Sequence, residues 1–439
     1  MPRTPNTQLQ LLLTAAAWRP AQLALAVRKV AAERGLDLPC HHTTVRRWLD
    51  GTQPRPPFPE LVLESFSRCL GRRVTVQEAG FTRAPAVLVD PSWEADPVRK
   101  LAQLTHAELD PQRRALLGAG VFTLTALALP DLPAPAGPIL RAGHARVDEM
   151  RSMTSLFATA ADQHGGQHVR AALSAYVAHD VLPRLHGPAR DHARPDLLSA
   201  AAQLTLLLGG MCADGGQDAA AQHYHQIAAR LAADGGDHLT LAIALRTMAT
   251  HAHDLGHRTT AVLGLTEQAD RHARHAPPGV RAYTKIQLAV LQAHHDRRAA
   301  LASLALAEQL HARAESAPGP FSTYPAGALH YQCAQVLAAL GDHAGAVGSL
   351  ASSLRLRGPS ERLPAALTTA RLAEAQLRLG HLEQALHHWR FFLDAYPAVR
   401  SARAVQRLHA ARRCLRPHQR HRGAAAVLDR IRDLTGTPA

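Results

Sequence analysis

A short basic segment near the N-terminus holds the residues of this 439-residue chain whose types and spacing are best suited to chemistry. Between Thr43 and Leu49, the spacing of Val45, Trp48 and Leu49 predicts a helix with one buried face. The opposite face would carry His42, Thr43, Arg46 and Arg47. Of these, His42, Thr43 and Arg47 are placed to read base edges in a major groove, and arginine can bind guanine through two hydrogen bonds.

Other interpretations of the same residues stay open. Arg46 and Arg47 are also what a plain solvated helix face would carry in an arginine-rich chain. His41 and His42 fit an ordinary helix start equally well, so a DNA contact by His42 is unsettled. Trp48 is expected in the core and not against a base.

The elements that must position this helix are three neighbouring helices. The first is expected from about Asn6 to Ala17, and the second begins with Pro20 in its first turn. Asp50-Gly51 ends the short basic helix, and a fourth helix is expected from about Pro59 to Leu70. Together they predict a small all-α domain over residues 1–81.

This layout resembles the Xre family of phage-repressor-like helix-turn-helix domains. The resemblance rests on an apolar-Ala pair, Leu23-Ala24, and on a third helix that ends in aromatic-x-x-Gly, from Trp48 to Gly51, followed by Pro. It implies phosphate contacts, which fix register without reading sequence, by Arg46, Arg19, Thr52, Gln53 and Arg55. The chain departs from the family in a second helix expected to continue to about Glu33, which can change the docking angle.

A closer resemblance is to actinobacterial regulators that join this domain to tetratricopeptide repeats. It rests on the run from Thr43 to Pro57, on Leu70-Gly71-Arg72-Arg73-Val74-Thr75, and on Asp162-Gln163-His164-Gly165-Gly166. The resemblance implies control of gene expression in development or secondary metabolism.

Residues 139–439 are Ala- and Leu-rich, with the apolar spacing of helices. The clearest unit, from Ala366 to Val399, resembles a tetratricopeptide repeat: small residues permit close helix crossing and Gly380 makes the turn between the helices. Weaker copies turn at Gly215, Gly256, His295 and Gly341, with spacings of 41, 39, 46 and 39 residues that predict longer helices. A last helix pair, 402–415 and 422–434, is interpreted as a cap. The region is therefore predicted to be an α-solenoid of tetratricopeptide type, with an irregular helical bundle as the alternative.

An array of this type has a concave face lined by its first helices, which suits a peptide, an acidic ligand or a partner protein. Arg246 and Lys285 occupy equivalent positions in successive units, so that together they can hold a carboxylate or a phosphate. The candidate inward residues are Arg246, Thr250, Lys285, Gln292, Tyr331, Gln335 and Glu374. Ordinary polar surface residues are the alternative reading of each.

A proline-rich linker is expected over residues 82–138. It includes an apolar run, 115–129, which is too short for a typical membrane span and is read as a buried connecting helix, with membrane contact as the alternative. The formal charge of +14 favours a polyanionic partner, nucleic acid or an anionic membrane surface. Five scattered cysteines and no secretion signal favour a reducing cytoplasm.

No nucleotide-binding, nucleophile-elbow or metal-ligand motif occurs in the sequence, so no enzyme activity, cofactor or metal is expected. The leading interpretation is a sequence-specific transcriptional regulator that binds double-stranded DNA as a homodimer, since such domains generally read two half-sites. The rival is an interaction scaffold whose N-terminal domain makes protein contacts.

Overall fold

The computed structural model describes residues 4–33, 38–55, 57–72, 74–81, 92–110, 117, 122–127, 129–133, 145–187, 193–315, 324–399 and 401–436. Within these ranges the chain is helical and contains no strand, which confirms the predicted all-α class. The chain divides into two compact units, Met1–Pro130 with Gln217–His223, and Asp131–Gly216 with Tyr224–Ala439. Each unit is described by itself.

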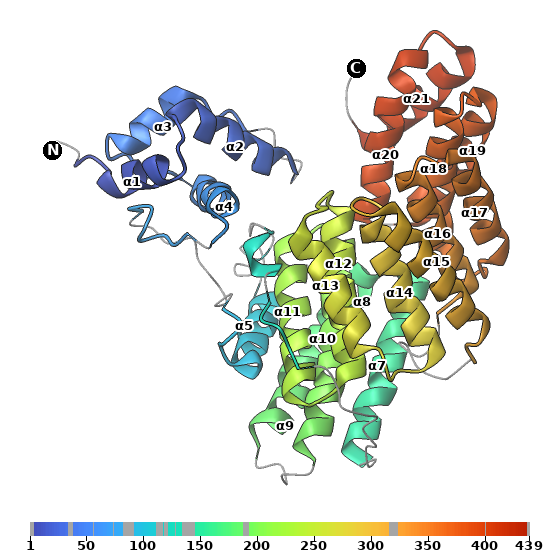
Figure 1. Ribbon diagram of the computed structural model, residues 1–439, viewed down its shortest axis with the longest axis horizontal. Helices are drawn as coiled ribbons and strands as arrows, with labels where there is room; N and C mark the ends of the chain where they lie inside the picture. Colours follow the sequence, from blue (N-terminus) through green and yellow to red (C-terminus); the bar gives the residue numbers. More distant parts are fainter. Residues whose placement is uncertain are drawn as a thin grey trace. The chain divides into compact units, whose positions relative to one another are not determined.

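The first unit begins with the four helices that the sequence predicts (Figure 1). They are α1 (Thr7–Ala15), α2 (Pro20–Glu33), α3 (His42–Leu49) and α4 (Phe58–Leu70), and α5 (Pro97–Leu109) follows. The long second helix is confirmed, since α2 ends at Glu33. Gly71, with φ of +64°, ends α4 in the left-handed conformation that glycine adopts without strain.

One hydrophobic core joins α1 to α4 with the segment that follows them. Leu9, Val27 and Phe66 are fully buried in it, and Phe81 is its last member. The two ends of this segment are joined by Asn6, whose Oδ1 accepts a hydrogen bond from the backbone N of Leu9 at 2.9 Å and caps α1. Its Nδ2 donates to the carbonyl of Ala79 at 2.8 Å. The two ends of this four-helix segment are therefore joined to each other.

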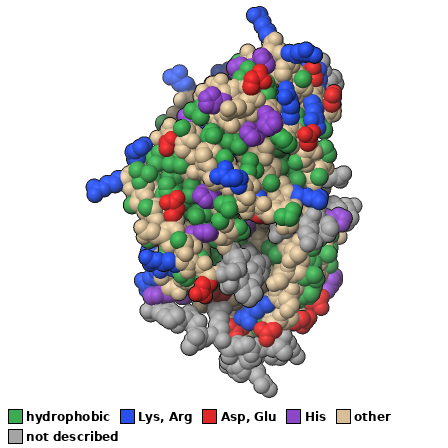
Figure 2. Space-filling view, turned by 90° about the vertical axis from the view of Figure 1, so that its right-hand side faces the viewer, with side chains coloured by type: hydrophobic (Ala, Val, Ile, Leu, Met, Phe, Trp, Pro, Cys, Tyr) green, Lys and Arg blue, Asp and Glu red, His purple; other side chains and the backbone are tan. Residues whose placement is uncertain are grey.

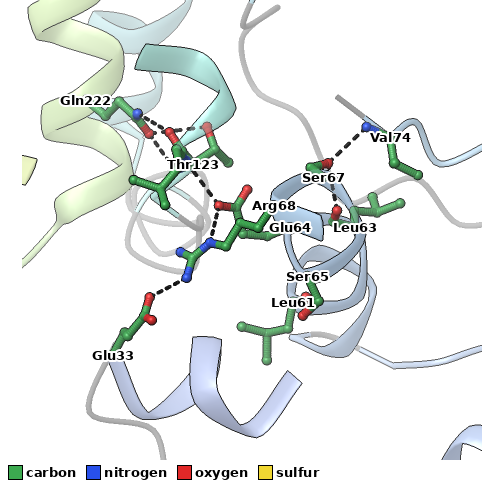
Figure 3. Close-up of polar contacts among 11 residues, drawn as sticks. Glu33, Leu61, Leu63, Glu64, Ser65, Ser67, Arg68, Val74, Thr123 and Gln222 are labelled. Atoms are coloured by element: carbon green, nitrogen blue, oxygen red, sulfur yellow. Dashed lines mark hydrogen bonds and ion pairs between the residues drawn. The ribbon is translucent and has the colours of Figure 1, made fainter. Parts of the chain in front are cut away.

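A buried carboxylate extends this unit beyond residue 81 (Figure 3). Glu64, only 3% exposed, accepts hydrogen bonds from Arg68 Nε at 2.7 Å and from the backbone N of Leu124 at 3.1 Å. Arg68 also pairs with Glu33 at 2.6 Å. Burial raises the pKa of Glu64, and the charge of Arg68 opposes the rise. Residue 124 thus completes the hydrogen bonding of a core carboxylate.

The apolar run 115–129 is described only in part. Leu117 and Leu127 are buried, and the described residues form a short 3-10 helix, η1 (Thr125–Leu127). Thr123 exchanges two hydrogen bonds with Gln222, of 2.8 and 2.6 Å (Figure 3). The described residues 122–124 and 129 are not helical, so the predicted connecting helix is not formed there. Residues 115–116, 118–121 and 128 of the run lie outside the described residues, as do 82–91, 111–114 and 134–138 of the predicted linker.

The second unit opens with α7 (Ala145–His164), α8 (Gly166–Tyr176), a π-helical turn η2 (Val177–Val181) and α9 (Leu182–His186). Helical hairpins follow one another from there to the C-terminal region (Figure 1). Their helices, in pairs, are α10 (Arg194–Asp214) and α11 (Asp218–Asp234), α12 (His238–Asp254) and α13 (Thr260–His272), α14 (Pro278–Gln292) and α15 (Arg297–Ala312), α16 (Ala326–Ala339) and α17 (His343–Leu356), α18 (Arg362–Arg378) and α19 (Leu382–Ala395), and α20 (Ala402–Leu415) and α21 (Arg422–Thr435). Two 3-10 turns, η3 (Tyr396–Ala398) and η4 (Arg416–His418), follow α19 and α20. This solenoid-like order agrees with the prediction.

Every predicted turn lies between the two helices of a hairpin. Three of the predicted glycines have the positive φ that a side chain would strain, +93° at Gly256, +85° at Gly341 and +83° at Gly380. In the first hairpin the left-handed residue is Gly216, with φ of +72°, and not the predicted Gly215. At the predicted His295 turn no glycine is needed, because the side chain of Asp296 caps α15.

The long repeat spacings have a cause that the sequence reading missed. The 46-residue spacing arises from the 13-residue connection 313–325, since α15 and α16 are only 16 and 14 residues long. Helix length contributes to the 41-residue spacing, which spans α11 and α12 with 17 residues each. The best-formed unit packs as expected, with Ala373, Ala385 and Trp389 fully buried.

The last hairpin is more than a cap. Helix α20 contacts α10, and Arg403 Nη2 pairs with Asp214 Oδ1 at 2.5 Å across 189 residues of sequence. The first helices of the hairpins therefore enclose a common inner space, with α20 beside α10.

By length and composition, α10 is the one helix in the described parts of the chain that is apolar enough to cross a membrane, and 78% of its most apolar window is buried inside the protein. The sequence analysis considered membrane contact for the apolar run 115–129 and not for α10. On the face drawn in Figure 2, the Lys and Arg side chains of described residues lie scattered among acidic and apolar ones.

Candidate nucleic-acid interface and candidate ligand pocket

Helix α3 is anchored by its apolar side. Val45 is fully buried, Trp48 is 4% exposed, and the Trp48 ring lies 5.5 Å from that of Phe58. The helix packs against α2 and ends at Asp50, after which Gly51 turns the chain with φ of +91°. Trp48 therefore belongs to the core, as expected, and the other face of α3 is directed outward.

That outward face is polar and basic. His42, Thr43, Arg46 and Arg47 are all exposed. Neither Arg46 nor Arg47 forms a side-chain hydrogen bond or an ion pair with any residue that the structure describes. The predicted base-reading residues thus share one exposed surface whose two arginines are available for a partner.

Three of the six acidic residues in residues 1–81 are paired with arginines outside α3. Glu33 and Glu64 pair with Arg68, and Glu78 pairs with Arg72 at 2.7 Å. Residues 1–81 contain eleven Lys and Arg against six Asp and Glu, which leaves a net charge of +5. These three acidic groups therefore do not pair with Arg46 or Arg47 on α3.

The residues expected at phosphates divide into two groups. Arg19 and Arg55 are exposed and form no side-chain contact with a described residue, which suits the role. Thr52 and Gln53 are half-buried, and Gln53 Nε2 donates to the carbonyl of Gly80 at 3.2 Å. In this conformation Gln53 joins the two ends of the domain.

A pocket of about 260 Å³ lies in the second unit. Its walls come from the first helices α12, α14, α16, α18 and α20, and from residues just before α16 and α18, in agreement with the expected inward face. The lining residues are Arg246, Thr250, Asp254, Tyr283, Tyr324, Ala328, Tyr331, Gln332, Gln335, Arg357, Leu363, Pro364, Leu367, Arg371, Arg403, Gln406 and Arg407.

Four of the seven candidate ligand residues line this pocket, namely Arg246, Thr250, Tyr331 and Gln335. Lys285, Gln292 and Glu374 do not. Lys285 Nζ pairs with Asp270 Oδ2 at 2.6 Å, so the structure does not bring it together with Arg246. Glu374 does not line the pocket but pairs with two arginines that do, Arg371 and Arg407.

The pocket is rich in guanidinium groups that the sequence reading missed. Arg357 pairs with Glu361 at 2.6 Å, while Arg371 and Arg407 share Glu374 at 3.3 and 2.9 Å. Asp214 raises the pKa of Arg403 above its ordinary value. These arginines lie on or just before α18 and α20. Arg403 and Arg407 were not predicted because α20 was interpreted as part of a cap and not as a first helix with an inward face.

Arg246 is bound differently from the other arginines. It is 7% exposed, its Nη1 donates to the hydroxyl of Tyr283 at 2.9 Å, and its Cζ lies 3.8 Å from the centre of the same ring. No carboxylate among the described residues pairs with it. Arg246 is therefore a buried cation with an aromatic partner only.

Comparison with known proteins gives one finding on the first unit. A family model described as the SP15 N-terminal domain matches residues 9–82. These bounds agree with the hydrophobic core that runs from Leu9 to Phe81. No curated protein matches the chain.

Proposed function

We propose that the chain is a cytoplasmic, sequence-specific DNA-binding regulator of transcription that acts as a homodimer. In this proposal α2 and α3 form a helix-turn-helix of Xre type, with α3 in the major groove. Thr43 and Arg47 read base edges, His42 lies beside them, and Arg19, Arg46 and Arg55 bind phosphates. Thr52 and Gln53 would contact the backbone only after small side-chain movements.

One observation carries this proposal. Arg46 and Arg47 are exposed and unpaired among the described residues, on a helix whose opposite side is fixed by Val45 and Trp48. A helix that is buried on one side and carries unpaired positive charges on the other is suited to a groove lined by phosphates. The net charge of +5 over residues 1–81 agrees with it.

The helical array is proposed to sense a small acidic ligand, a peptide or a protein partner and to alter DNA affinity through the arrangement of the dimer. The pocket with Arg246, Thr250, Tyr331 and Gln335 supports this part. No catalytic role is proposed for either unit.

Selection from a pool of random-sequence DNA duplexes with the full-length protein tests the DNA-binding proposal. We expect enrichment of one motif with two half-sites related by two-fold symmetry and about 10 base pairs apart. The motif should be lost with Arg47→Ala and kept with Arg72→Ala, which removes an exposed arginine already paired with Glu78. Recovery of the unselected pool would contradict sequence-specific binding.

A second function, an interaction scaffold, is favoured by one observation. Leu11 and Leu25, on α1 and α2, are 64% and 60% exposed, so both apolar side chains are accessible to a protein partner. In that case selection enriches no motif, while Leu25→Asp abolishes association of the protein with itself or with a partner. If the protein both selects a motif and loses dimers with Leu25→Asp, these leucines belong to the regulator's dimer interface.

A further inference from the structure

The pocket of the second unit contains a nearly balanced set of charges with one cation left over. Its five arginines face one lining carboxylate, Asp254, and three carboxylates just behind the wall. Those three are Asp214, Glu361 and Glu374, and they pair with the arginines other than Arg246. Five positive and four negative charges leave one positive charge, and by position it belongs to Arg246.

Arg246 also has hydrogen-bonding capacity that the protein does not use. A guanidinium has five N–H donors, and among the described residues Arg246 forms a single hydrogen bond, to Tyr283. Arg246 is more than nine-tenths buried, and its Nε is buried without a hydrogen-bond partner. An unmade hydrogen bond of a buried charged group is costly, so an anion in the pocket would be strongly favoured.

Aromatic and apolar side chains form one part of the pocket lining. Tyr283 and Tyr324 meet edge to face with ring centres 5.1 Å apart. Tyr324 is 9% exposed, its hydroxyl has no hydrogen-bond partner, and burial raises its pKa. Leu363 and Leu367 line the same space from α18. The surface beside the cation therefore suits an apolar or aromatic group.

We propose that this pocket binds a small organic monoanion, a carboxylate that carries an apolar or aromatic group, with the carboxylate on Arg246 and the apolar group between Tyr283, Tyr324 and Leu367. The inference gives a chemical class to the ligand of the proposed sensing function and rests on it. One surplus charge selects a monoanion, and Asp254 disfavours a second negative charge. A volume of about 260 Å³ is just below the roughly 300–1,000 Å³ usual for small-molecule sites, so the pocket holds a small acid or one peptide residue.

Calorimetric titration of the full-length protein with two acids tests the proposal and identifies the source of the carboxylate. The probes are 3-phenylpropanoate and the tripeptide N-acetyl-Gly-Gly-Phe, each a monoanion at neutral pH and each compared with its neutral amide. We expect an acid to bind and its amide not to bind. Tighter binding of the tripeptide would indicate a peptide terminus, and tighter binding of 3-phenylpropanoate would indicate a free small acid. If neither acid binds at millimolar concentration, the proposal is wrong.

Two variants locate the binding. Arg246→Ala should weaken the acid at least ten-fold, and Arg298→Ala, which removes an exposed arginine of α15, should leave it unchanged. Equal binding by wild type and Arg246→Ala would overturn the assignment. Should Arg246→Ala lose its helical circular dichroism, Leu367→Asp replaces it, since Leu367 is half-buried in the lining and this change places a second carboxylate beside the apolar group of the ligand. We then expect at least two-fold weaker binding, and unchanged affinity would count against the proposal.

The titration contains no DNA, so its outcome is independent of the proposed regulation. Loss of motif selection with intact acid binding would reject the regulator and keep the pocket. The reverse result would reject the monoanion and keep the regulator.

Discussion

Arg46 and Arg47 are adjacent on α3, and replacing each of them is expected to change DNA binding in a different way. Arg46 is assigned to a phosphate and Arg47 to a base edge. Arg46→Ala should therefore change the salt dependence of DNA binding, while Arg47→Ala should change its sequence preference. Both side chains are exposed and unpaired among the described residues, so neither change should disturb the fold.

The magnitude follows from the number of free cations near α3. Arg19, Arg46 and Arg55 give three phosphate contacts per domain, and each contributes about −0.9 to the slope of log K against log salt concentration. One domain then has a slope of about −2.7 and a dimer about −5.4, which corresponds to roughly a thousand-fold loss of dimer affinity between 50 and 200 mM salt. Arg46→Ala should reduce the slope of the dimer by about 1.8.

Arg47→Ala has another expected signature. A good arginine–guanine pair contributes about 1–3 kcal/mol of discrimination between base pairs. Affinity for the selected motif should therefore fall by at least about five-fold per half-site, while affinity for a scrambled duplex changes far less.

Fluorescence anisotropy with both duplexes at four salt concentrations measures the two effects. Arg72→Ala is the matched control, because it removes an exposed arginine of the same domain that is paired with Glu78. The reasoning is refuted if Arg46→Ala and Arg47→Ala alter slope and preference alike, or if Arg72→Ala does as much as either.

Three further perturbations test the fold. His225 is 1% exposed and burial lowers its pKa to about 3, so its contribution to stability is present above the ordinary value of 6.5 and is lost as the pH falls from there toward 3. Between pH 7 and 5 this group is expected to lower the free energy of unfolding by about 2 kcal/mol. Urea unfolding at both pH values should show that His225→Gln removes this decrease and that His409→Gln, which changes an exposed histidine, keeps it. An unaltered decrease in His225→Gln would contradict the prediction. Gly80→Ala places a Cβ 2.2 Å from Asn6 Oδ1 at a φ of +63°, so thermal unfolding of the first unit should show a destabilisation of about 2–3 kcal/mol, and an unchanged melting temperature would argue against this closure of the domain. Trp389→Ala empties a fully buried site and should cost about 3–5 kcal/mol in urea unfolding of the array, a result below 1 kcal/mol being incompatible with the packing described.

Local signals explain why the helices of this chain were predictable. The N-terminal ends of α1, α15 and α17 are fixed by the capping side chains of Asn6, Asp296 and Asp342, and glycines turn the chain between the two helices of a hairpin. Such residues act on backbone within a few positions, so they are visible in sequence. The apolar side of α3 was likewise predictable from helical spacing.

The pocket was only half predictable, because its remaining residues depend on distant packing. Helical phase places Arg246 and Tyr331 on inward faces, and that part could be derived. The same phase gave Lys285, but its partner Asp270 lies on the preceding helix α13 and no repeat register reveals that ion pair. Arg403 enters the pocket because α20 contacts α10, which is a property of the curvature of the array.

The hydrogen bond from the backbone of Leu124 to Glu64 has a practical consequence for isolating the N-terminal helical domain. The family match ends at residue 82, which invites a fragment cut at Phe81. Such a fragment would keep the hydrophobic core and leave a buried carboxylate without its backbone donor. A fragment that extends to Leu127 retains that donor, so the segment after residue 81 serves as a structural part of the domain it follows and not merely as a tether.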